Sequence, residues 1–291
     1  MHRGFDVPAF LSRQQLRYAR SHSPLGGLMT KRRTTWTILL ALLLAFAMIT
    51  AACSSDSEES GPTAAAGSCD VADLNLVTAG TLTVATGEPA FPPWVGTTDG
   101  EGFDDPTSQL GYEAGLVYAI ADELGFADTD VVWTRIGFNE AIAPGDKPWD
   151  FNLQQYSITE DREEVVDFSS PYYVTRQALV LYPDSPFASA ETVDDLKEAI
   201  LGAQIGTTSL DFIENVIEPN TEPNVYDENV DLEAAMKAGQ IDGLVMDLPA
   251  SYYVTAVQLE GAIIAGQFES EAAEPDAYGL LFAEGNPSSP V

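Results

Sequence analysis

Histidine and basic residues are scarce in this chain, and those present are concentrated near its start. The 291 residues include two His, and 13 Lys and Arg stand against 45 Asp and Glu, which gives a formal net charge of −32. Both histidines and seven of the 13 basic residues precede Cys53, together with one acidic residue, Asp6. The chain from Cys53 onward therefore keeps six basic and 44 acidic residues, a net charge of −38. Because such a surface repels nucleic acid and anionic lipid, we expect neither as a partner.

The lack of histidine after position 53 excludes acid-base chemistry by imidazole and His-ligated metal sites from that part of the chain. Cysteine is equally rare, since Cys53 and Cys69 are its only two copies. A catalytic thiol at Cys69 would lack a histidine partner. We therefore expect no metal, no cofactor and an inert thiol at Cys69.

The apolar run over residues 36–49 is too short to span a membrane as a helix. It follows three basic residues at 31–33 and precedes Ala51 and Ala52, which is typical of a bacterial secretion signal. The junction over residues 50–53, Thr-Ala-Ala-Cys, resembles a lipobox, in which cleavage precedes a cysteine that then carries lipid. We therefore expect lipidation of Cys53, which would leave no internal disulfide. An ordinary signal peptide that contains a cysteine is the alternative.

The segments around this signal have predicted boundaries. Met29 directly precedes the basic residues, so we expect translation to start there and residues 1–28 to be an extension outside the protein. Residues 29–52 form the predicted lipoprotein signal peptide, and residues 53–77 form the lipidated cysteine and a flexible linker. Within that linker, residues 54–68 are small, polar and acidic without an apolar period. The predicted location is the outer face of the bacterial cytoplasmic membrane.

From residue 81 onward, short apolar runs alternate with segments of helical period. Strands are predicted at residues 81–86, 131–135, 150–154, 178–182, 203–207, 224–227 and 241–247. Helices are predicted around Leu116, Ile120 and Leu124, which share one face, and over residues 193–200, 210–217 and 232–238. This alternation indicates an α/β fold, and the length suits two lobes rather than one.

The segment over residues 150–173 places a single arginine, Arg162, after an apolar stretch that ends in amide and hydroxyl side chains. A planar guanidinium offers a carboxylate two parallel N–H donors, and this charge-assisted pair is strong where water is excluded. A surface arginine paired with a neighbouring acid at position 161, 163 or 164 is the structural alternative. The strings Ser-Ile-Thr-Glu-Asp-Arg and Val-Asp-Phe-Ser-Ser-Pro-Tyr within this segment resemble the signature of family 3 extracellular solute-binding proteins. These are the receptors of ABC importers for polar amino acids.

That resemblance extends from about Thr81 to Asn286 and implies the fold. Family members resemble two flavodoxin-like α/β lobes, the periplasmic-binding-protein type II architecture, joined by two crossover segments with a ligand cleft between them. On this basis residues 78–174 and 280–291 form lobe 1, and residues 175–279 form lobe 2. Family members continue beyond the matched segment into a helix that packs on lobe 1, so we expect that C-terminal helix to be missing. The resemblance also implies a monomer.

The resemblance implies ligand-binding residues in the loop after the first strand. Phe91 matches the aromatic residue that stacks on the ligand, and Trp94 is a further aromatic residue of the same loop. Packing on the lobe is the structural alternative for Phe91. Glu88 precedes both aromatic residues, and it favours a cationic ligand if it faces the cleft.

Arg162 matches the arginine that binds the α-carboxylate of the ligand. Gln154, Gln155 and Ser157 match the segment that hydrogen-bonds the ligand from lobe 1, where the family often has small residues in place of the glutamines. Two amides fill volume and offer donors and acceptors, which suggests a smaller or more polar ligand side chain. Capping of nearby backbone is equally consistent with either glutamine taken alone.

In lobe 2, residues 206–209 lie between a predicted strand and a predicted helix, where free backbone N–H groups bind anions. Thr207 and Thr208 match the family positions that contact the ligand. Asp247 ends the strand at 241–247 and matches the aspartate that pairs with the α-ammonium group. The alternative for Asp247 is an N-cap of a helix that begins near Pro249. Arginine for a carboxylate and aspartate for an ammonium group together describe an α-amino acid.

These features predict a lipid-anchored receptor that closes around a polar amino acid and delivers it to an ABC permease, without catalysing a reaction. Two alternatives stay open. Cyclohexadienyl and arogenate dehydratases resemble the same fold and could use a cleft acid such as Glu88 or Asp247, whereas a sensory module would bind the ligand for a signalling partner. One departure from the family pattern is Gly115, which replaces the second acid of a Gly-Phe-Asp-Val-Asp-Leu element at residues 111–116.

Overall fold

The computed structural model describes residue 71, residues 74–267 and residues 275–286. The predicted extension, signal peptide and lipidation site at Cys53, and the predicted inert thiol at Cys69, lie outside the described residues. Within the described part of the chain, no helix has the length and apolar character needed to cross a membrane.

The first sheet contains five strands and is built mainly from the N-terminal half of the described chain. Its strands are β1 (Leu82–Thr86), β2 (Val131–Arg135), β3 (Phe151–Asn152), β4 (Val166–Phe168) and β12 (Leu281–Ala283), in the order β2-β1-β3-β12-β4. β1 pairs in parallel with β2 and β3, whereas β12 runs antiparallel to β3 and β4. The C-terminal strand therefore returns to the sheet that the first strand begins. We call the part of the chain built on this sheet lobe 1.

Successive residues of β1 face opposite sides of the sheet, so the strand has a core on each face. Val84 packs with Val117 and Ala121 of helix α2 (Tyr112–Leu124). Ala85 belongs to a second cluster, which includes Ala141 of helix α3 (Phe138–Ile142). Helix α4 (Glu160–Glu163) is a single turn that joins the end of β3 to β4. Helices on both faces of a mainly parallel sheet are the arrangement expected of an α/β lobe.

The second sheet also has five strands, and we call the part of the chain built on it lobe 2. Its strands are β6 (Gln177–Leu181), β7 (Leu201–Gln204), β8 (Asn224–Tyr226), β9 (Gly243–Asp247) and β10 (Ile263–Gly266), in the order β10-β6-β9-β7-β8. β7 is parallel to β8 and β9, and β6 is antiparallel to β9 and β10. Buried aliphatic side chains from the sheet pack with helices α5 (Thr208–Phe212), α6 (Asn229–Lys237) and α7 (Leu248–Tyr253).

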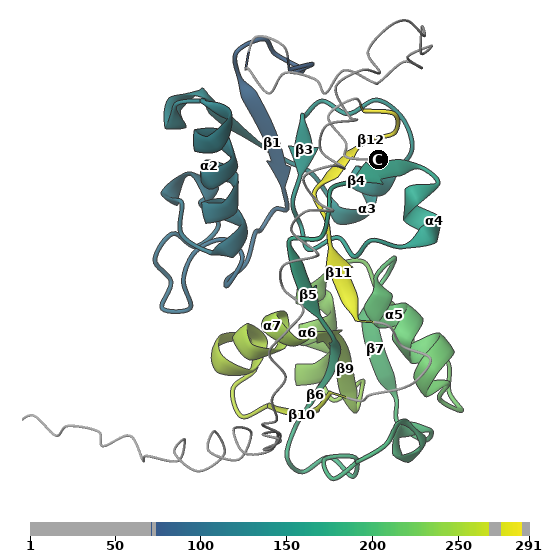
Figure 1. Cartoon of the computed structure of the whole chain (residues 1–291). Helices are drawn as coiled ribbons and strands as arrows, with labels where there is room; N and C mark the ends of the chain where they lie inside the picture. The colour runs from purple at the N-terminus through teal and green to yellow at the C-terminus, as the bar shows by residue number, and fades with distance from the viewer. Residues whose placement is uncertain (1–70, 72–73, 268–274, 287–291) are drawn as a thin grey trace, which may run out of the picture. The chain divides into compact units, whose positions relative to one another are not determined.

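The chain passes between the two sheets twice, and the two passages pair with each other. β5 (Tyr173–Thr175) follows β4 and leads into β6, while β11 (Asp276–Tyr278) follows β10 and leads into β12. The two strands form an antiparallel ribbon in which Asp276 faces Thr175 and Tyr278 faces Tyr173 (Figure 1). We call this ribbon the hinge ribbon. The sheets and the ribbon have the two-lobe architecture of type II periplasmic binding proteins, whereas the exact lobe boundaries proposed from the sequence stay a prediction.

The predicted and observed elements differ at one strand and at several short helical segments. β7, at Leu201–Gln204, begins and ends earlier than the strand predicted at 203–207. The predicted helix over residues 193–200 is wrong in its second half, because only a 3-10 helix at Val193–Leu196 forms and β7 begins at Leu201. The predicted helix over 210–217 begins two residues earlier as α5 and continues as a π-helix at Ile213–Ile217. Other short segments are 3-10 helices at Pro106–Ser108 and Asp128–Asp130 and a π-helix at Val254–Gln258.

The loop that carries Trp94 is fixed to the start of α2 by main-chain hydrogen bonds. Tyr112 N donates to Pro93 O over 2.8 Å, and Glu113 N donates to Trp94 O over 3.0 Å. Gly111 makes this close approach possible. Its φ is +95°, and a Cβ atom there would overlap the carbonyl group of Trp94. The sequence therefore fixes the aromatic loop against α2 through a position that only glycine fits.

We expect Gly111→Ala to lower the free energy of unfolding by about 3 kcal/mol, because it combines left-handed backbone strain with a clash against rigid main chain. Gly125→Ala is the matched control, since Gly125 has a φ of +87° but a Cβ atom added there would have no neighbour within 4 Å. Strain alone should cost that variant about 1 kcal/mol. Urea unfolding of both variants measures the difference, and equal losses would show that the contact with Trp94 imposes no constraint.

Candidate ligand-binding site

Two adjoining cavities contain all ten residues that the sequence predicts to bind a ligand. The small cavity, of about 90 Å³, is lined by eight of them: Trp94, Gln154, Gln155, Ser157, Arg162, Thr207, Thr208 and Asp247. The large cavity, of about 390 Å³, is lined by Glu88 and Phe91 and shares Trp94, Gln154 and Gln155 with the small one. Several of these residues lie just beyond the carboxyl ends of strands, where ligands of open α/β sheets bind.

Arg162 lines the small cavity and is only 8% exposed. It belongs to the single turn of α4, whose start is capped when the Thr159 side chain accepts a hydrogen bond from Arg162 N. Its Nη1 donates to Ser157 O over 2.6 Å, and its Nη2 donates to Gly206 O over 2.9 Å. The alternative of an ion pair with an adjacent surface acid is therefore wrong. The guanidinium instead links lobe 1 to the turn that precedes α5 in lobe 2.

Arg162 also stacks on an aromatic ring and is surrounded by acids. Its Cζ lies 5.5 Å from the centre of the Phe138 ring. Burial lowers the pKa of Arg162, and the nearby charges of Asp211, Asp276 and Asp247 oppose this fall. A buried guanidinium with this environment stays charged and can bind a carboxylate.

Thr207 and Thr208 lie at the start of α5, opposite Ser157. The Thr207 hydroxyl caps the helix by accepting from Leu210 N, and it donates to Gln204 O over 2.7 Å. Thr208 Oγ1 lies 3.3 Å from Ser157 Oγ, so hydroxyl groups of the two lobes are in contact. Gly206 precedes these two threonines and has a φ of +73°. A Cβ atom there would overlap Oδ1 of Asn139, which belongs to lobe 1.

Asp247 stands at the carboxyl end of β9 and at the N-cap position of α7, but its side chain makes no capping hydrogen bond. Its Oδ1 accepts from Gln177 Nε2 over 2.8 Å instead. Asp247 thus occupies the N-cap position of the structural alternative, but its side chain does not cap the helix. Burial raises the pKa of Asp247 to about 7, and the Asp276 carboxylate adds to the rise, while the side chains of Tyr278, Gln177 and Arg162 oppose it.

The two glutamines have different surroundings. Gln154 donates to Asn152 Oδ1 over 3.2 Å and to the main-chain oxygen of Ile136 over 3.3 Å. The second bond agrees with the alternative in which this glutamine bonds to nearby backbone. Gln155 has a φ of +54°, and its main-chain and side-chain nitrogens both donate to the carboxyl group of Glu113. Their contact with a ligand stays a prediction, as it does for the other site residues.

Aromatic and acidic side chains line the outer part of the site. Phe91 lies with its ring 5.9 Å from that of Phe103 and 6.3 Å from that of Tyr253, so it both packs locally and borders the large cavity. Trp94 is 4% exposed and makes edge contacts with three tyrosine rings. Glu88 from lobe 1 and an acid at position 228 of lobe 2 both border the large cavity and are exposed.

Sequence reasoning did not assign a role to three residues that organise the site. Glu113 is 1% exposed and accepts from Tyr172 Oη as well as from Gln155. Burial raises the pKa of Glu113 to about 7, against the opposing effect of these donors. Asp276 is the first residue of β11 in the hinge ribbon, and it contacts Ser157. Gln177 is the first residue of β6, which follows the ribbon strand β5, and it contacts Asp247. Glu113 could have been suspected as the acid in the glycine-initiated element at 111–116, but no pattern in the sequence identified Asp276 or Gln177.

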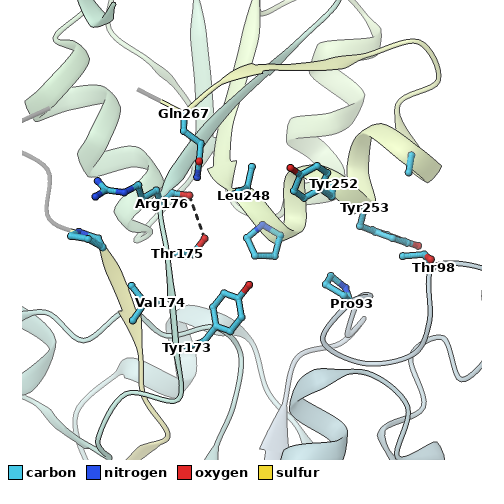
Figure 2. Close-up of a pocket in the computed structure, with 13 residues that line it drawn as sticks. Pro93, Thr98, Tyr173, Val174, Thr175, Arg176, Leu248, Tyr252, Tyr253 and Gln267 are labelled. Carbon is cyan, nitrogen blue, oxygen red and sulfur yellow. Dashed lines mark hydrogen bonds between the residues drawn. The ribbon is translucent and has the colours of Figure 1, made fainter. Parts of the chain in front are cut away.

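A larger pocket of about 750 Å³ lies on the hinge ribbon and contains none of the ten predicted residues (Figure 2). Tyr173, Val174, Tyr252 and Tyr253 are among its mainly apolar lining residues. Arg176 is the one charged residue in the described part of its lining, and in Figure 2 its guanidinium points away from the middle of the pocket. We assign the candidate site to the two cavities instead, because they combine the buried cation of Arg162 with the buried carboxyl group of Glu113 and the partly buried one of Asp247. The described residues contain no group of three or more His, Cys, Asp or Glu placed to hold a metal ion.

Comparison with known proteins places these features in a family. Residues 82–247 match the sequence profile of the bacterial extracellular solute-binding proteins, family 3. A protein of Campylobacter jejuni described as a probable histidine-binding protein is 25% identical over 170 residues, which are 57% of this chain and 60% of that protein. The glutamate-binding protein GluB of Corynebacterium efficiens is 25% identical over 57% of this chain and 56% of its own length. The match thus spans little more than half the length of these curated relatives.

Solved structures give the same result for the fold. The structure of an ancestral arginine-binding protein bound to glutamine is 28% identical to this chain and superposes with a TM-score of 0.58. The superposition covers 72% of this chain and 86% of that one.

We expect the buried carboxyl group of Glu113 to make folding stability depend on pH. Because its pKa is raised from an ordinary value of 4.5 to about 7, the stability that it contributes is present at low pH and is lost as the pH rises through 7. Relative to Glu113→Gln, the wild type should lose about 3 kcal/mol of unfolding free energy between pH 4.5 and pH 8. Denaturant unfolding at several pH values measures this difference. Glu123→Gln, an exposed change on the same helix, should leave the wild-type slope intact.

Proposed function

Since this chain belongs to the bacterial extracellular solute-binding proteins of family 3, we propose that it captures a polar α-amino acid in the cavities between its lobes. The observation that carries the proposal is the small cavity, in which the guanidinium of Arg162 and the carboxyl group of Asp247 come from different lobes. A free amino acid is the simplest ligand that presents a carboxylate and an ammonium group on one carbon. Binding these groups from opposite lobes would hold the lobes together.

The charges around the large cavity favour a ligand side chain that is polar or positively charged. Glu88 and Glu228 line the large cavity from opposite lobes. Phe91 and Trp94 line it as well, and their rings offer flat surfaces on which a guanidinium or an amide can stack. An anionic side chain would meet the exposed carboxylates of Glu88 and Glu228 and the buried carboxyl group of Glu113, without a described cation among the lining residues. We therefore expect L-arginine to bind more tightly than L-glutamate.

We further propose that the protein is anchored outside the cytoplasmic membrane by a lipid on Cys53 and delivers its ligand, as a monomer, to an ABC permease. The family supports an extracellular location, and the sequence pattern at residues 50–53 supports the anchor. Closing around the ligand would present a lobe arrangement that a permease can distinguish from the empty one.

A dehydratase activity is the second candidate, because the raised pKa of Asp247 is what a general acid requires near neutral pH. Glu113 has a similar pKa, but its contacts with Tyr172 and Gln155 enclose it. Incubation with arogenate or prephenate separates the candidates, since a receptor leaves both compounds unchanged. The sensory alternative predicts neighbouring genes for a signalling protein rather than for a permease and an ATPase.

We expect Arg162→Ala to weaken L-arginine binding roughly thirtyfold or more, because losing one partner of a desolvated charge pair costs about 2 to 5 kcal/mol. Isothermal titration calorimetry on the folded chain from Ser54 measures the change. Arg176→Ala is the matched control, since Arg176 lines the hinge pocket and neither of the two cavities. If both variants bind as the wild type does, Arg162 does not bind the carboxylate.

The pKa of Asp247 also predicts how affinity depends on pH. An ammonium group requires the ionised carboxylate, so binding should strengthen as the pH rises through about 7 and should release a proton below that value. Between pH 8 and pH 6 the affinity for L-arginine should fall about tenfold. Titrations in buffers of different ionisation enthalpy count the protons released. An affinity that is constant over this range would exclude an ammonium acceptor whose pKa is raised to about 7.

A further inference from the structure

The side-chain nitrogen of Gln177 lies among three oxygen atoms that belong to different parts of the fold. Nε2 is 2.8 Å from Asp247 Oδ1, 2.8 Å from Asp276 Oδ2 and 3.3 Å from Thr208 Oγ1. The oxygen of the same amide accepts from Ser209 Oγ over 2.7 Å, which fixes which end of the amide faces the carboxyl groups. Gln177 is 6% exposed, and its contacts with the three oxygen atoms are partly buried.

Asp276 extends this set of contacts into lobe 1. Its Oδ1 accepts from Ser157 Oγ over 2.9 Å, while its Oδ2 accepts from Gln177. Asp276 is the first residue of β11, so it stands on the returning strand of the hinge ribbon. Asp276 therefore contacts Ser157, a proposed ligand-binding residue of lobe 1, directly. It is connected to Asp247, a proposed ligand-binding residue of lobe 2, through the side-chain amide of Gln177.

The backbone holds these side chains in register. Gln177 and Asp247 are directly paired residues of the antiparallel strands β6 and β9. Ser157 forms an isolated bridge with Tyr278, two residues beyond Asp276 on β11. Both ends of the network are therefore tied to paired main chain rather than to an unpaired loop.

We propose that Asp276 is a positioning residue of the ligand site, which orients Ser157 directly and Asp247 through Gln177, and which sets the charge state in which Asp247 meets the ligand. The proposal rests on the amino-acid-binding function proposed above and adds a residue on the hinge to it. Asp276 lines neither cavity, so it acts through its neighbours.

The electrostatic part of this role follows from two acids that share one donor. A primary amide has two hydrogens, and here one amide nitrogen faces two carboxyl groups and a hydroxyl oxygen. With both carboxyl groups ionised, their repulsion is opposed by the charge of Arg162 and by the Tyr278 hydroxyl on β11, the other groups that act on Asp247. Asp276 thus favours the protonated form of Asp247 until a ligand ammonium group replaces the proton.

The test is Asp276→Asn, with L-arginine as the probe and calorimetric titration from pH 5.5 to 8.5. The asparagine keeps the size of the side chain but removes its charge, so the pH midpoint of binding should fall by about one unit. At pH 8.5, where Asp247 is ionised in both proteins, affinity should fall about threefold to tenfold, because Ser157 and Gln177 lose a charged acceptor. Asp211→Asn is the control for a general change in charge, since Asp211 acts on Arg162 but does not contact Gln177 or Ser157.

A midpoint that stays at the wild-type value would overturn the proposal, even if Asp276→Asn weakens binding, because a purely structural role changes affinity at every pH alike. An equal shift in Asp211→Asn would overturn it as well. Wild-type protein that is folded but binds none of L-arginine, L-histidine, L-glutamine and L-glutamate would instead overturn the proposed function, and this inference with it.

Gln177→Met provides a second test if Asp276→Asn does not fold, as judged by thermal unfolding followed by circular dichroism. Methionine keeps the approximate volume of glutamine and removes the donor that favours ionised Asp247. The pH midpoint should then rise, in the direction opposite to that expected for Asp276→Asn. A midpoint unchanged by Gln177→Met would show that the bridge does not connect Asp276 to Asp247.

Discussion

The buried guanidinium of Arg162 is the constraint on which the arrangement of the site depends. A charged group with 8% exposure must have its donors satisfied, and two of them reach main-chain oxygens of different lobes, Ser157 and Gly206. The capped turn of α4 and the turn before α5 place these oxygens within reach of the guanidinium. Acids also gather nearby, and Asp211, Asp276 and Asp247 keep the guanidinium charged.

Acid clusters of this kind are costly, and the fold offsets the cost with neutral donors. Gln155 and Tyr172 donate hydrogen bonds to Glu113, whereas Gln177 donates to both Asp247 and Asp276. Each donor also belongs to an element that lies at the candidate site or next to the hinge ribbon. In the proposed function, the same side chains would therefore link proton binding, ligand binding and the relative position of the lobes.

Most of the architecture could be predicted from the sequence, because strands with continuous apolar runs and helices with apolar faces leave a periodic signal. β1, β2 and β9 lie within the residues predicted for them, and α6 contains most of its predicted helix. The prediction of a helix over residues 193–200 was wrong in its second half. The apolar spacing there fits a helix, but in the structure the helical segment ends after one 3-10 turn. The positions of Arg162 and Asp247 followed from the motif and from the end of a strand. Asp276 could not be found in this way, because its contacts with Ser157 and Gln177 join residues about 100 positions apart, which the pairing of β11 with β5 brings together.

Gly206 stands where the two lobes touch. Its φ of +73° favours glycine, and a Cβ atom there would meet Oδ1 of Asn139 in lobe 1. The Asn139 side chain is exposed and can rotate away, but it would then lose its hydrogen bond to Ile205 O of lobe 2. A side chain at position 206 would therefore leave each lobe intact and remove a contact between them, which favours arrangements in which the lobes stand apart.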